Sequence, residues 1–287
     1  MKPAVFDYIR PESLSEALAA LAQHGAAGTI LAGGQSLVPM MNLRVVKPEV
    51  VIDINRVPGL GEIRVDGGEL VIGALARHAA LLASELVKTH CPLMAEAYPW
   101  VAHGPIRNRG TLGGNISHAD PASEMPAVLA ACDAKIIAKS AKATRTIMAT
   151  EFFVAPLTTA LAAGEMLTEI RIPIAPHGQG WSWQEESNRH GDYAMAGVGV
   201  TLTLGGGRCT QAGVAVGGMD RAGVRLAQVE AHLVGAALDQ ARIASAAKLA
   251  AELVQADDSY HADARYKREL LEVLTTRALA TARGRCK

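Results

Sequence analysis

The chain has 287 residues, and its 49% hydrophobic and 20% charged content predicts two or three folded subdomains and excludes a disordered or collagen-like protein. Basic and acidic side chains balance at 28 each, so no overall positive field would attract nucleic acid or an anionic membrane. The composition therefore leaves small molecules and other proteins as the expected partners.

The N-terminal part predicts a small α/β unit. Ser13 and Glu16 form a capping box that begins a helix, and Gly25 ends this helix. Short apolar runs follow, with the glycines of a turn after the first of them. We expect strands at residues 29–32 and 49–54, with a helical segment at residues 37–44 between them.

The middle of the chain predicts strands mixed with short helices. A turn at residues 66–68 joins two apolar runs into a β-hairpin. The expected strands are residues 63–65, 70–73, 134–138, 144–148 and 167–172, and the expected helices are residues 77–84, 93–102 and 125–131. Residues 173–180 hold two prolines and two glycines in a polar stretch, which predicts a linker.

The C-terminal part predicts an antiparallel sheet followed by helices. A strand at residues 181–185 precedes a hairpin that turns at the three glycines of residues 205–207. The hairpin strands are expected at residues 197–204 and 210–216, and two or three helices at residues 227–283. The expected domain boundaries are 1–57, 58–175 and 176–287.

The cysteines and the N-terminus indicate the cellular setting. The four cysteines form no CxxC pair and fit no compact metal motif, so we expect free thiols, no metal site and no iron–sulfur cluster on this chain. The N-terminus lacks an apolar signal segment, and no apolar stretch is long enough to span a bilayer. We expect a soluble, cytoplasmic protein.

Two double-glycine segments are the strongest chemical signal in the sequence. Gly33-Gly34 follows an apolar strand and precedes Gln35 and Ser36, and Gly113-Gly114 lies between Thr111 and Asn115. Such turns can point consecutive backbone N–H groups at a phosphate without a Cβ in the way. One such pair is usually a tight turn only, and neither segment is a Rossmann fingerprint or a P-loop. From the residues alone, a phosphate site and two structural turns both stay open.

The segment after the second glycine pair could add polar contacts to a ligand. Asp120, Ser123 and Glu124 surround a proline turn, where they could accept hydrogen bonds from sugar hydroxyls. The alternative is an Asx turn followed by ordinary residues of a helix N-terminus, which the segment favours when taken alone.

Five motifs together resemble the FAD-binding medium subunits of the molybdenum hydroxylases, a family that includes carbon monoxide, xanthine and nicotine dehydrogenases. The motifs occur in the family's order and span almost the whole chain. They are FDYIRPESLSEAL at residues 6–18, LAGGQSLVPMM at 31–41, IRNRGTLGGNISHADPASEMP at 106–126, GEMLTEIRIP at 164–173, and RHGDYAMAGV at 189–198.

The resemblance implies an α+β fold and an FAD site. The fold would comprise two α/β FAD-binding subdomains, similar to those of vanillyl-alcohol oxidase, and a C-terminal domain with an antiparallel sheet and helices. Leu167 would lie beside the isoalloxazine and Tyr193 would cover it. The cofactor-binding residues that the resemblance implies are Ala32, Gly33, Gly34, Gln35, Ser36, Leu37, Ala102, Thr111, Gly113, Gly114, Asn115, Glu124, Leu167 and Tyr193.

Two departures from the family bear on the flavin. Glu124 is one methylene longer than the aspartate that usually holds the ribityl chain. The family often has a lysine near the flavin pyrimidine edge, where this chain has Gln184, Glu185 and Glu186. A cation that could stabilise reduced flavin is therefore missing, which leaves the flavin potential open.

The function that the resemblance implies is electron transfer within a complex. A large subunit would hold the molybdenum cofactor, a small subunit two [2Fe–2S] clusters, and FAD on this chain would pass electrons to an external acceptor. The assembly would be a heterotrimer or a dimer of heterotrimers, acting on an N-heterocycle, an aldehyde or carbon monoxide. No residue here is expected to act as a catalytic acid or base. The alternatives are a stand-alone FAD-dependent reductase or oxidase, and a non-redox nucleotide-binding module.

Overall fold

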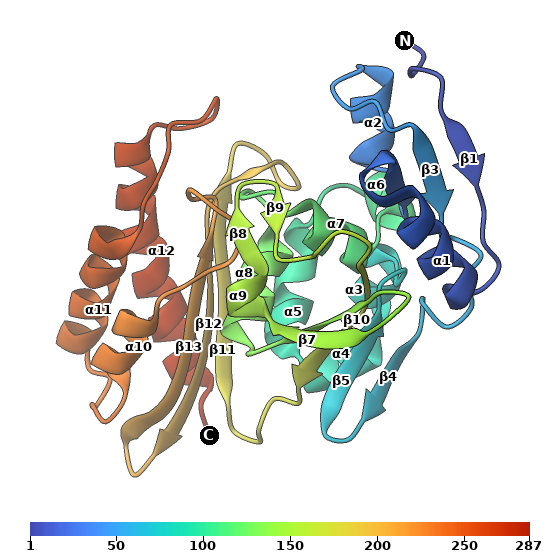
Figure 1. Cartoon of the computed structure of the whole chain (residues 1–287). Coiled ribbons are helices and arrows are strands. Elements are labelled where there is room, and N and C mark those ends of the chain that lie inside the picture. The colour runs from blue at the N-terminus through green and yellow to red at the C-terminus, as the bar shows by residue number, and fades with distance from the viewer.

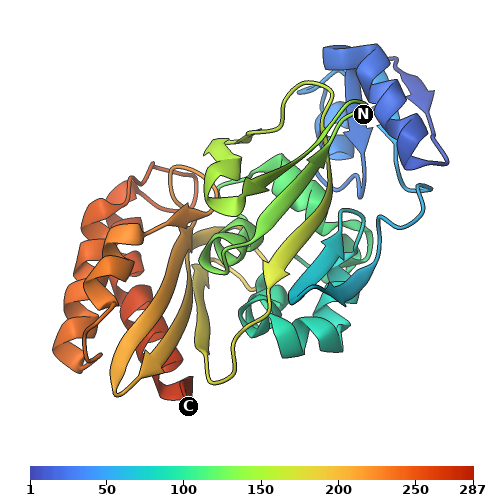
Figure 2. The same cartoon turned by 60° about the horizontal axis from the view of Figure 1, so that its bottom comes forward.

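Three main β-sheets lie in a row along the molecule, one in each section of the chain (Figure 1). The computed structural model describes all residues from Met1 to Lys287. The N-terminal section is at one end, the C-terminal helices are at the other, and the central section separates them in both views (Figure 2). None of the helices combines the length and the apolar character needed to cross a lipid bilayer.

The N-terminal section is a three-stranded parallel sheet packed by one amphipathic helix. Ser13 caps this helix as expected, since its side chain accepts a hydrogen bond from the Glu16 backbone N–H. The first strand was missed in the sequence because its residues are mostly exposed and give no apolar alternation. The sheet order is β1-β3-β2, with β1 at Asp7–Ile9, β2 at Gly28–Leu31 and β3 at Val50–Asp53, accompanied by α1 at Leu14–His24, a 3-10 turn at Gly25–Ala27 and α2 at Leu37–Asn42.

The central section is a five-stranded antiparallel sheet with short helices. Its order is β4-β5-β10-β6-β7, with β4 at Ile63–Asp66, β5 at Glu69–Gly73, β6 at Lys135–Lys139, β7 at Thr144–Met148 and β10 at Met166–Pro173. The helices are α3 at His78–Ala83, α4 at Glu85–His90, α5 at Pro92–Ala97, a 3-10 turn at Tyr98–Trp100, α6 at Gly104–Arg109, α7 at Leu112–His118, α8 at Glu124–Ala131 and α9 at Ala149–Phe152; the small strands are β8 at Phe153–Ala155 and β9 at Thr158–Thr159.

The C-terminal section is a four-stranded antiparallel sheet between two helical layers. Helices α10 and α12 pack on the outer face with α11 packed against both of them, and α5 and α8 of the central section pack on the inner face (Figure 1). The sheet order is β11-β12-β13-β14, with β11 at Gly180–Ser187, β12 at Ala194–Gly205, β13 at Arg208–Gly217 and β14 at Val224–Arg225, followed by α10 at Ala227–Leu233, α11 at Gln240–Leu253 and α12 at Ala264–Arg285. The α+β architecture with a C-terminal antiparallel sheet and helices confirms the expected fold class. The domain boundaries stay a prediction.

The hydrophobic core of the N-terminal section is small and depends on the central section. This cluster has only ten buried residues, and three of them, Leu60, Leu75 and Met166, come from beyond residue 57. A core of this size would lose a large share of its buried apolar surface without them. The first sheet is therefore held in place by packing against the second section.

The end of helix α12 ties the C-terminal section to the central one. The Arg285 side chain donates a hydrogen bond to the Trp181 carbonyl (2.8 Å) and forms an ion pair with Glu96 on α5. The Lys287 backbone N–H donates to the Gly178 carbonyl at 3.1 Å. The linker between the two sections is thus bonded to the last helix.

The close packing of α8 on β13 predicts a strong effect of Gly213→Ala. A Cβ at Gly213 would lie 2.2 Å from the Ala131 carbonyl oxygen and 2.6 Å from Thr201 Oγ1. Because a backbone carbonyl cannot move away cheaply, we expect a loss of about 1–3 kcal/mol in the free energy of unfolding, measured by urea titration. Gly61→Ala is the control, because its Cβ would meet nothing within 4 Å. Equal stability of the two variants would contradict this packing.

Candidate functional site

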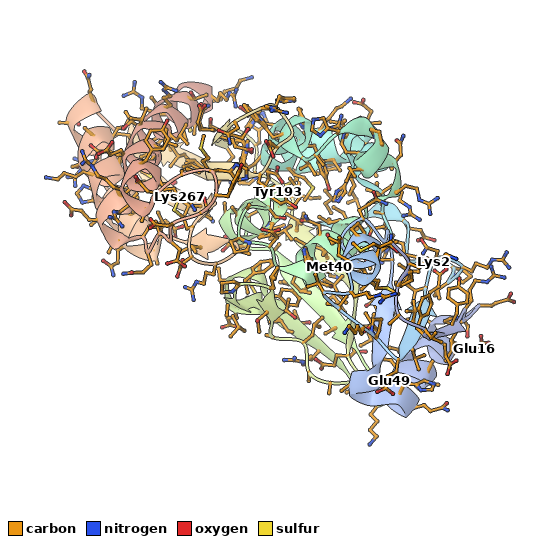
Figure 3. The ribbon with its side chains drawn as sticks, turned by 90° about the horizontal axis from the view of Figure 1, so that it is seen from above. Lys2, Glu16, Met40, Glu49, Tyr193 and Lys267 are labelled. Atoms are coloured by element: carbon orange, nitrogen blue, oxygen red, sulfur yellow. The ribbon has the colours of Figure 1, made fainter.

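A cavity of about 670 Å³ lies where the three sections meet, a volume typical of cofactor sites. Figure 3 labels two of its lining residues, Tyr193 toward the C-terminal section and Met40 beside the N-terminal section. All fourteen residues expected at a cofactor site line this one cavity: Ala32, Gly33, Gly34, Gln35, Ser36, Leu37, Ala102, Thr111, Gly113, Gly114, Asn115, Glu124, Leu167 and Tyr193.

The first glycine segment is a true turn between β2 and α2. Gly34 has a φ of +73°, a conformation that favours glycine, whereas Gly33 is needed for a different reason. A Cβ on Gly33 would lie 2.5 Å from the Arg109 carbonyl oxygen and 2.8 Å from Gly110 Cα. The expectation that this missing side chain makes room for a ligand is therefore corrected: it makes room for another backbone segment.

The second glycine segment is the first turn of helix α7, not a loop. Thr111 is the N-cap, and its Oγ1 accepts a hydrogen bond from the Gly114 N–H at 3.1 Å. Neither glycine has a positive φ, so the segment is a capped helix N-terminus and not a turn, and its role in cofactor binding stays a prediction. The physical reason is the threonine, which caps a helix where the glycines alone suggested a turn.

The two glycines of α7 have different neighbours. A Cβ on Gly113 would lie 2.6–2.7 Å from atoms of Ala74, so this glycine allows α7 to pack on the chain after β5. A Cβ on Gly114 would meet only its own cap, Thr111 Oγ1 at 2.8 Å, and Ala32 Cβ at 3.8 Å. Gly114 thus lies beside Ala32 of the first motif, and no backbone atom of another segment lies within 4 Å of the position that its Cβ would take.

The Arg107 side chain holds one wall of the cavity, and the sequence reasoning missed it. Its guanidinium donates to the carbonyls of Val101 (2.9 Å) and Ala102 (2.7 Å). Ala102 has a φ of +47°, an unfavourable conformation for a residue with a side chain. A Cβ on Gly191 would lie 2.6 Å from the Ala102 carbonyl oxygen, so the two backbones are in close contact. Gly191 belongs to the loop that carries Tyr193, and this wall therefore touches that loop. The paired arginines of the IRNRG motif were a signal for this role.

Two polar atoms in the lining have no hydrogen-bond partner. The Asn115 amide donates to Ser123 Oγ at 2.9 Å, but its Oδ1 is buried and free, as is Nδ1 of His78. Burial lowers the pKa of His78 to about 4, so its imidazole is neutral near pH 7 and can both donate and accept. Buried polar atoms without partners are costly, and a polar ligand with hydroxyl and ring N–H groups would satisfy them. The lining therefore fits a dinucleotide cofactor.

One side of the cavity is buried, and the other side is open to solvent. Leu167 and Glu124 are buried, and burial raises the pKa of Glu124 to about 7. Tyr193 is 60% exposed and its ring stacks on His261, with the centroids 6.4 Å apart. His103 and His118 also line the cavity, in the loop before α6 and at the end of α7. The tyrosine side is thus the side open to solvent.

The three polar residues expected near the flavin pyrimidine edge do not line the cavity. Gln184 bonds to Ser182 Oγ at 3.1 Å, and Glu186 is exposed. Only Glu185 is buried inside the molecule, and burial, followed by the charge of Glu124, raises its pKa. The structure brings together no group of three His, Cys, Asp or Glu side chains that could hold a metal ion.

Two family models match consecutive parts of this chain. Residues 4–175 match the FAD binding domain in molybdopterin dehydrogenase, and residues 181–282 match the CO dehydrogenase flavoprotein C-terminal domain.

Curated relatives and solved structures match over the full length. The chain is 40% identical to the 6-hydroxypseudooxynicotine dehydrogenase complex subunit alpha of Paenarthrobacter nicotinovorans, covering 100% of this chain and 97% of the relative. It is 38% identical to the caffeine dehydrogenase subunit beta of Pseudomonas sp. strain CBB1, covering 99% and 97%. A carbon monoxide dehydrogenase from Hydrogenophaga pseudoflava, which lacks the Mo-pyranopterin moiety, has a chain that superposes with a TM-score of 0.97 at 37% identity, covering 100% of both chains.

The contacts of Arg107 predict that Arg107→Met loosens the wall at Val101 and Ala102. Loss of two charge-assisted hydrogen bonds should cost about 1.5–3 kcal/mol each at most, and less once water replaces them. Hydrogen exchange at residues 101–104 should become faster, and Arg109→Met is the matched control because the Arg109 side chain is exposed and makes no such bond. Unchanged exchange in Arg107→Met would contradict the role given to this arginine.

Proposed function

Because this chain belongs to the family of FAD-binding flavoprotein subunits of the molybdenum hydroxylases, we propose that it carries electrons on FAD from [2Fe–2S] clusters of a partner subunit to an external acceptor. The family consists of oxidoreductase subunits, and FAD is the cofactor of its medium subunits. We take the partners to be a large molybdenum-binding subunit and a small iron–sulfur subunit.

One observation carries this proposal: the two glycine motifs, Glu124, Leu167 and Tyr193 line a single cavity. They come from three sections of the chain that are far apart in sequence. A cavity assembled in this way suits a long ligand with chemically different parts, such as a dinucleotide with a flavin ring.

The residues of the cavity would divide the cofactor between them. The turn at residues 32–36 offers backbone N–H groups around Gly34 and the Ser36 hydroxyl for the pyrophosphate. Asn115 and Glu124 offer acceptors for ribityl or ribose hydroxyls. When bound, FAD supplies the chemistry of accepting electrons and passing them on.

Leu167 and Tyr193 would flank the flavin ring. Leu167 is buried on β10 and offers an apolar contact, whereas Tyr193 is mostly exposed at the open side of the cavity. An aromatic ring there could cover the flavin and still leave an edge accessible to an electron acceptor. No side chain of this chain needs to touch the organic substrate.

The substrate oxidised by the complex would be a small molecule, and an N-heterocycle or a related compound is the class we favour. Two similar proteins are named for dehydrogenases of 6-hydroxypseudooxynicotine and caffeine. The selective pocket would lie on the large subunit, so this chain does not decide between these substrates.

FAD retention provides the first test. Gly114→Val should remove most of the bound FAD, because the new side chain would lie between the two motifs where the cofactor is expected. The measurement is the flavin absorption near about 450 nm after reconstitution and gel filtration. Gly284→Val, at a helical glycine in α12 with nothing within 4 Å and outside the cavity lining, should keep FAD. Gly33→Val is a poorer test, since it should also disturb the fold. Full FAD content in Gly114→Val would contradict the site.

Electron flow in the assembled complex separates the proposal from a stand-alone flavin enzyme and from a non-redox module. Adding substrate to the complex with both partner subunits should bleach the flavin band. The isolated chain should show no bleaching with the same substrate. Full activity of the isolated chain would favour the stand-alone enzyme, and absence of any flavin band would favour the non-redox module.

A further inference from the structure

Glu185 is a buried carboxyl group with no cation beside it. It lies on β11 with 5% exposure, and its Oε2 accepts a hydrogen bond from Trp183 Nε1 at 3.0 Å. Its other oxygen, Oε1, is buried without any partner. A carboxylate held in this way has lost most of its hydration and has regained only one hydrogen bond.

A second buried carboxyl group, Glu124, connects this region to the cofactor cavity. It lies in the first turn of α8 with 6% exposure and lines the cavity. The strand pairing brings the two regions together: Glu185 lies opposite Gly197, and Gly197 lies opposite Gly217. A Cβ on Gly217 would lie 3.2 Å from the carbonyl oxygen of Ser123, the residue before Glu124. Burial, and then the charge of Glu124, accordingly raises the pKa of Glu185.

The groups that face this pair from the neighbouring elements are neutral or acidic. Tyr98, in the 3-10 turn after α5, is fully buried and its hydroxyl has no partner. Burial, and then the charges of Cys91 and Glu124, raises the pKa of this tyrosine. Asp120, in the loop before α8, adds a further negative charge near Glu124. Trp183 donates the one hydrogen bond described above. No lysine or arginine is among the groups that shift either carboxyl group.

Two carboxylates in such surroundings cannot both be ionised at low cost. Burial is the largest cause for both groups: it raises the pKa of Glu124 to about 7, with Asp120 adding to the shift, and that of Glu185 to about 8, with Glu124 adding to it. Near neutral pH at least one of the two groups therefore keeps its proton. The unpartnered Oε1 of Glu185 is a natural place for it.

We propose that Glu124 and Glu185 form a proton-storing pair that gains a proton when the bound flavin becomes more negative and loses it when the flavin is reoxidised. This proposal rests on the proposed function, since it needs FAD in the cavity. In this proposal Glu185 does not touch the cofactor. It changes the charge near the flavin through Glu124, so it is a positioning residue.

The charges balance as follows. Two electrons from the reductant and one proton leave the flavin one charge more negative than before. A second proton, taken from solvent, binds to the carboxylate of the pair and restores the local charge. Reoxidation by the acceptor removes both electrons and returns both protons to solvent.

The pair would replace a fixed positive charge by one that depends on pH. A lysine side chain would compensate reduced flavin at every pH below its own deprotonation. A carboxyl pair can compensate the negative charge of reduced flavin only at a pH at which the pair still binds a proton. The reduction potential of this protein should therefore depend more steeply on pH in the range where the pair titrates.

The first experiment measures the flavin midpoint potential of the FAD-loaded full-length chain between about pH 6 and pH 9.5, a range that brackets the titration of the pair. Wild type should show a steeper fall of potential with pH above about pH 7 than Glu185→Gln does, because the variant lacks one proton-binding group. Glu186→Gln, at the exposed neighbour on the same strand, should follow wild type. Equal slopes in Glu185→Gln and wild type, with FAD retained, would overturn the proposal alone. Absence of flavin from wild type would instead contradict the proposed function, on which the pair depends.

The second experiment needs no cofactor and measures the stability of the apo chain against pH. The folded protein keeps a proton on Glu185 that the unfolded chain releases, so wild-type stability should fall as pH rises from about 4.5 to about 8. Glu185→Gln removes this dependence, so its unfolding midpoint should exceed that of wild type at pH 8.5 and approach it at pH 5. Glu186→Gln should show no such pH-dependent difference. The same pH profile for both variants would mean that Glu185 ionises normally in the folded chain and would overturn the proposal.

Discussion

The site depends on a contact between two stretches of backbone, residues 32–34 and 109–110, which is possible because residue 33 has no side chain. Arg77 strengthens the contact, since its guanidinium donates to the Arg109 carbonyl and to Asn55 Oδ1. Asn55 in turn donates to the Ala32 carbonyl at 2.7 Å. The first and second motifs are thus joined by main-chain packing and a short hydrogen-bond network, and the cavity exists only where they meet.

The same contact explains why the N-terminal section needs no large core of its own. Its ten-residue cluster borrows Leu60, Leu75 and Met166 from the central section, and the Gly33 contact fixes its orientation at the other side. Asn115 and His78, whose buried polar atoms lack partners, line the cavity that both sections border. A bound cofactor would satisfy these atoms, so ligand binding and the joining of the sections should stabilise each other.

The sequence predicted most elements from local signals, and the resemblance of its motifs selected residues that line one cavity. That these residues bind FAD stays a prediction. The Ser13 capping box, the glycine hairpin at residues 205–207 and the order of the five motifs each act over short distances. It could not predict that Gly113-Gly114 is helical or that Gly33 faces Arg109, because those outcomes depend on a cap and on a contact 76 residues away. Arg107 and the Glu124–Glu185 relation were missed for the same reason: burial and partners appear only in three dimensions.

The bonds at the end of α12 have a mechanical consequence. Arg285 joins α12 to Glu96 on α5, and Lys287 joins the end of the chain to Gly178 in the linker, so rotation of the C-terminal section about the linker would break an ion pair and a hydrogen bond. Two attachments at the end of α12 restrict such a rotation more than one attachment would. In the electron-transfer role proposed above, a stiff frame would keep the distances between the electron donor, the flavin and the acceptor constant.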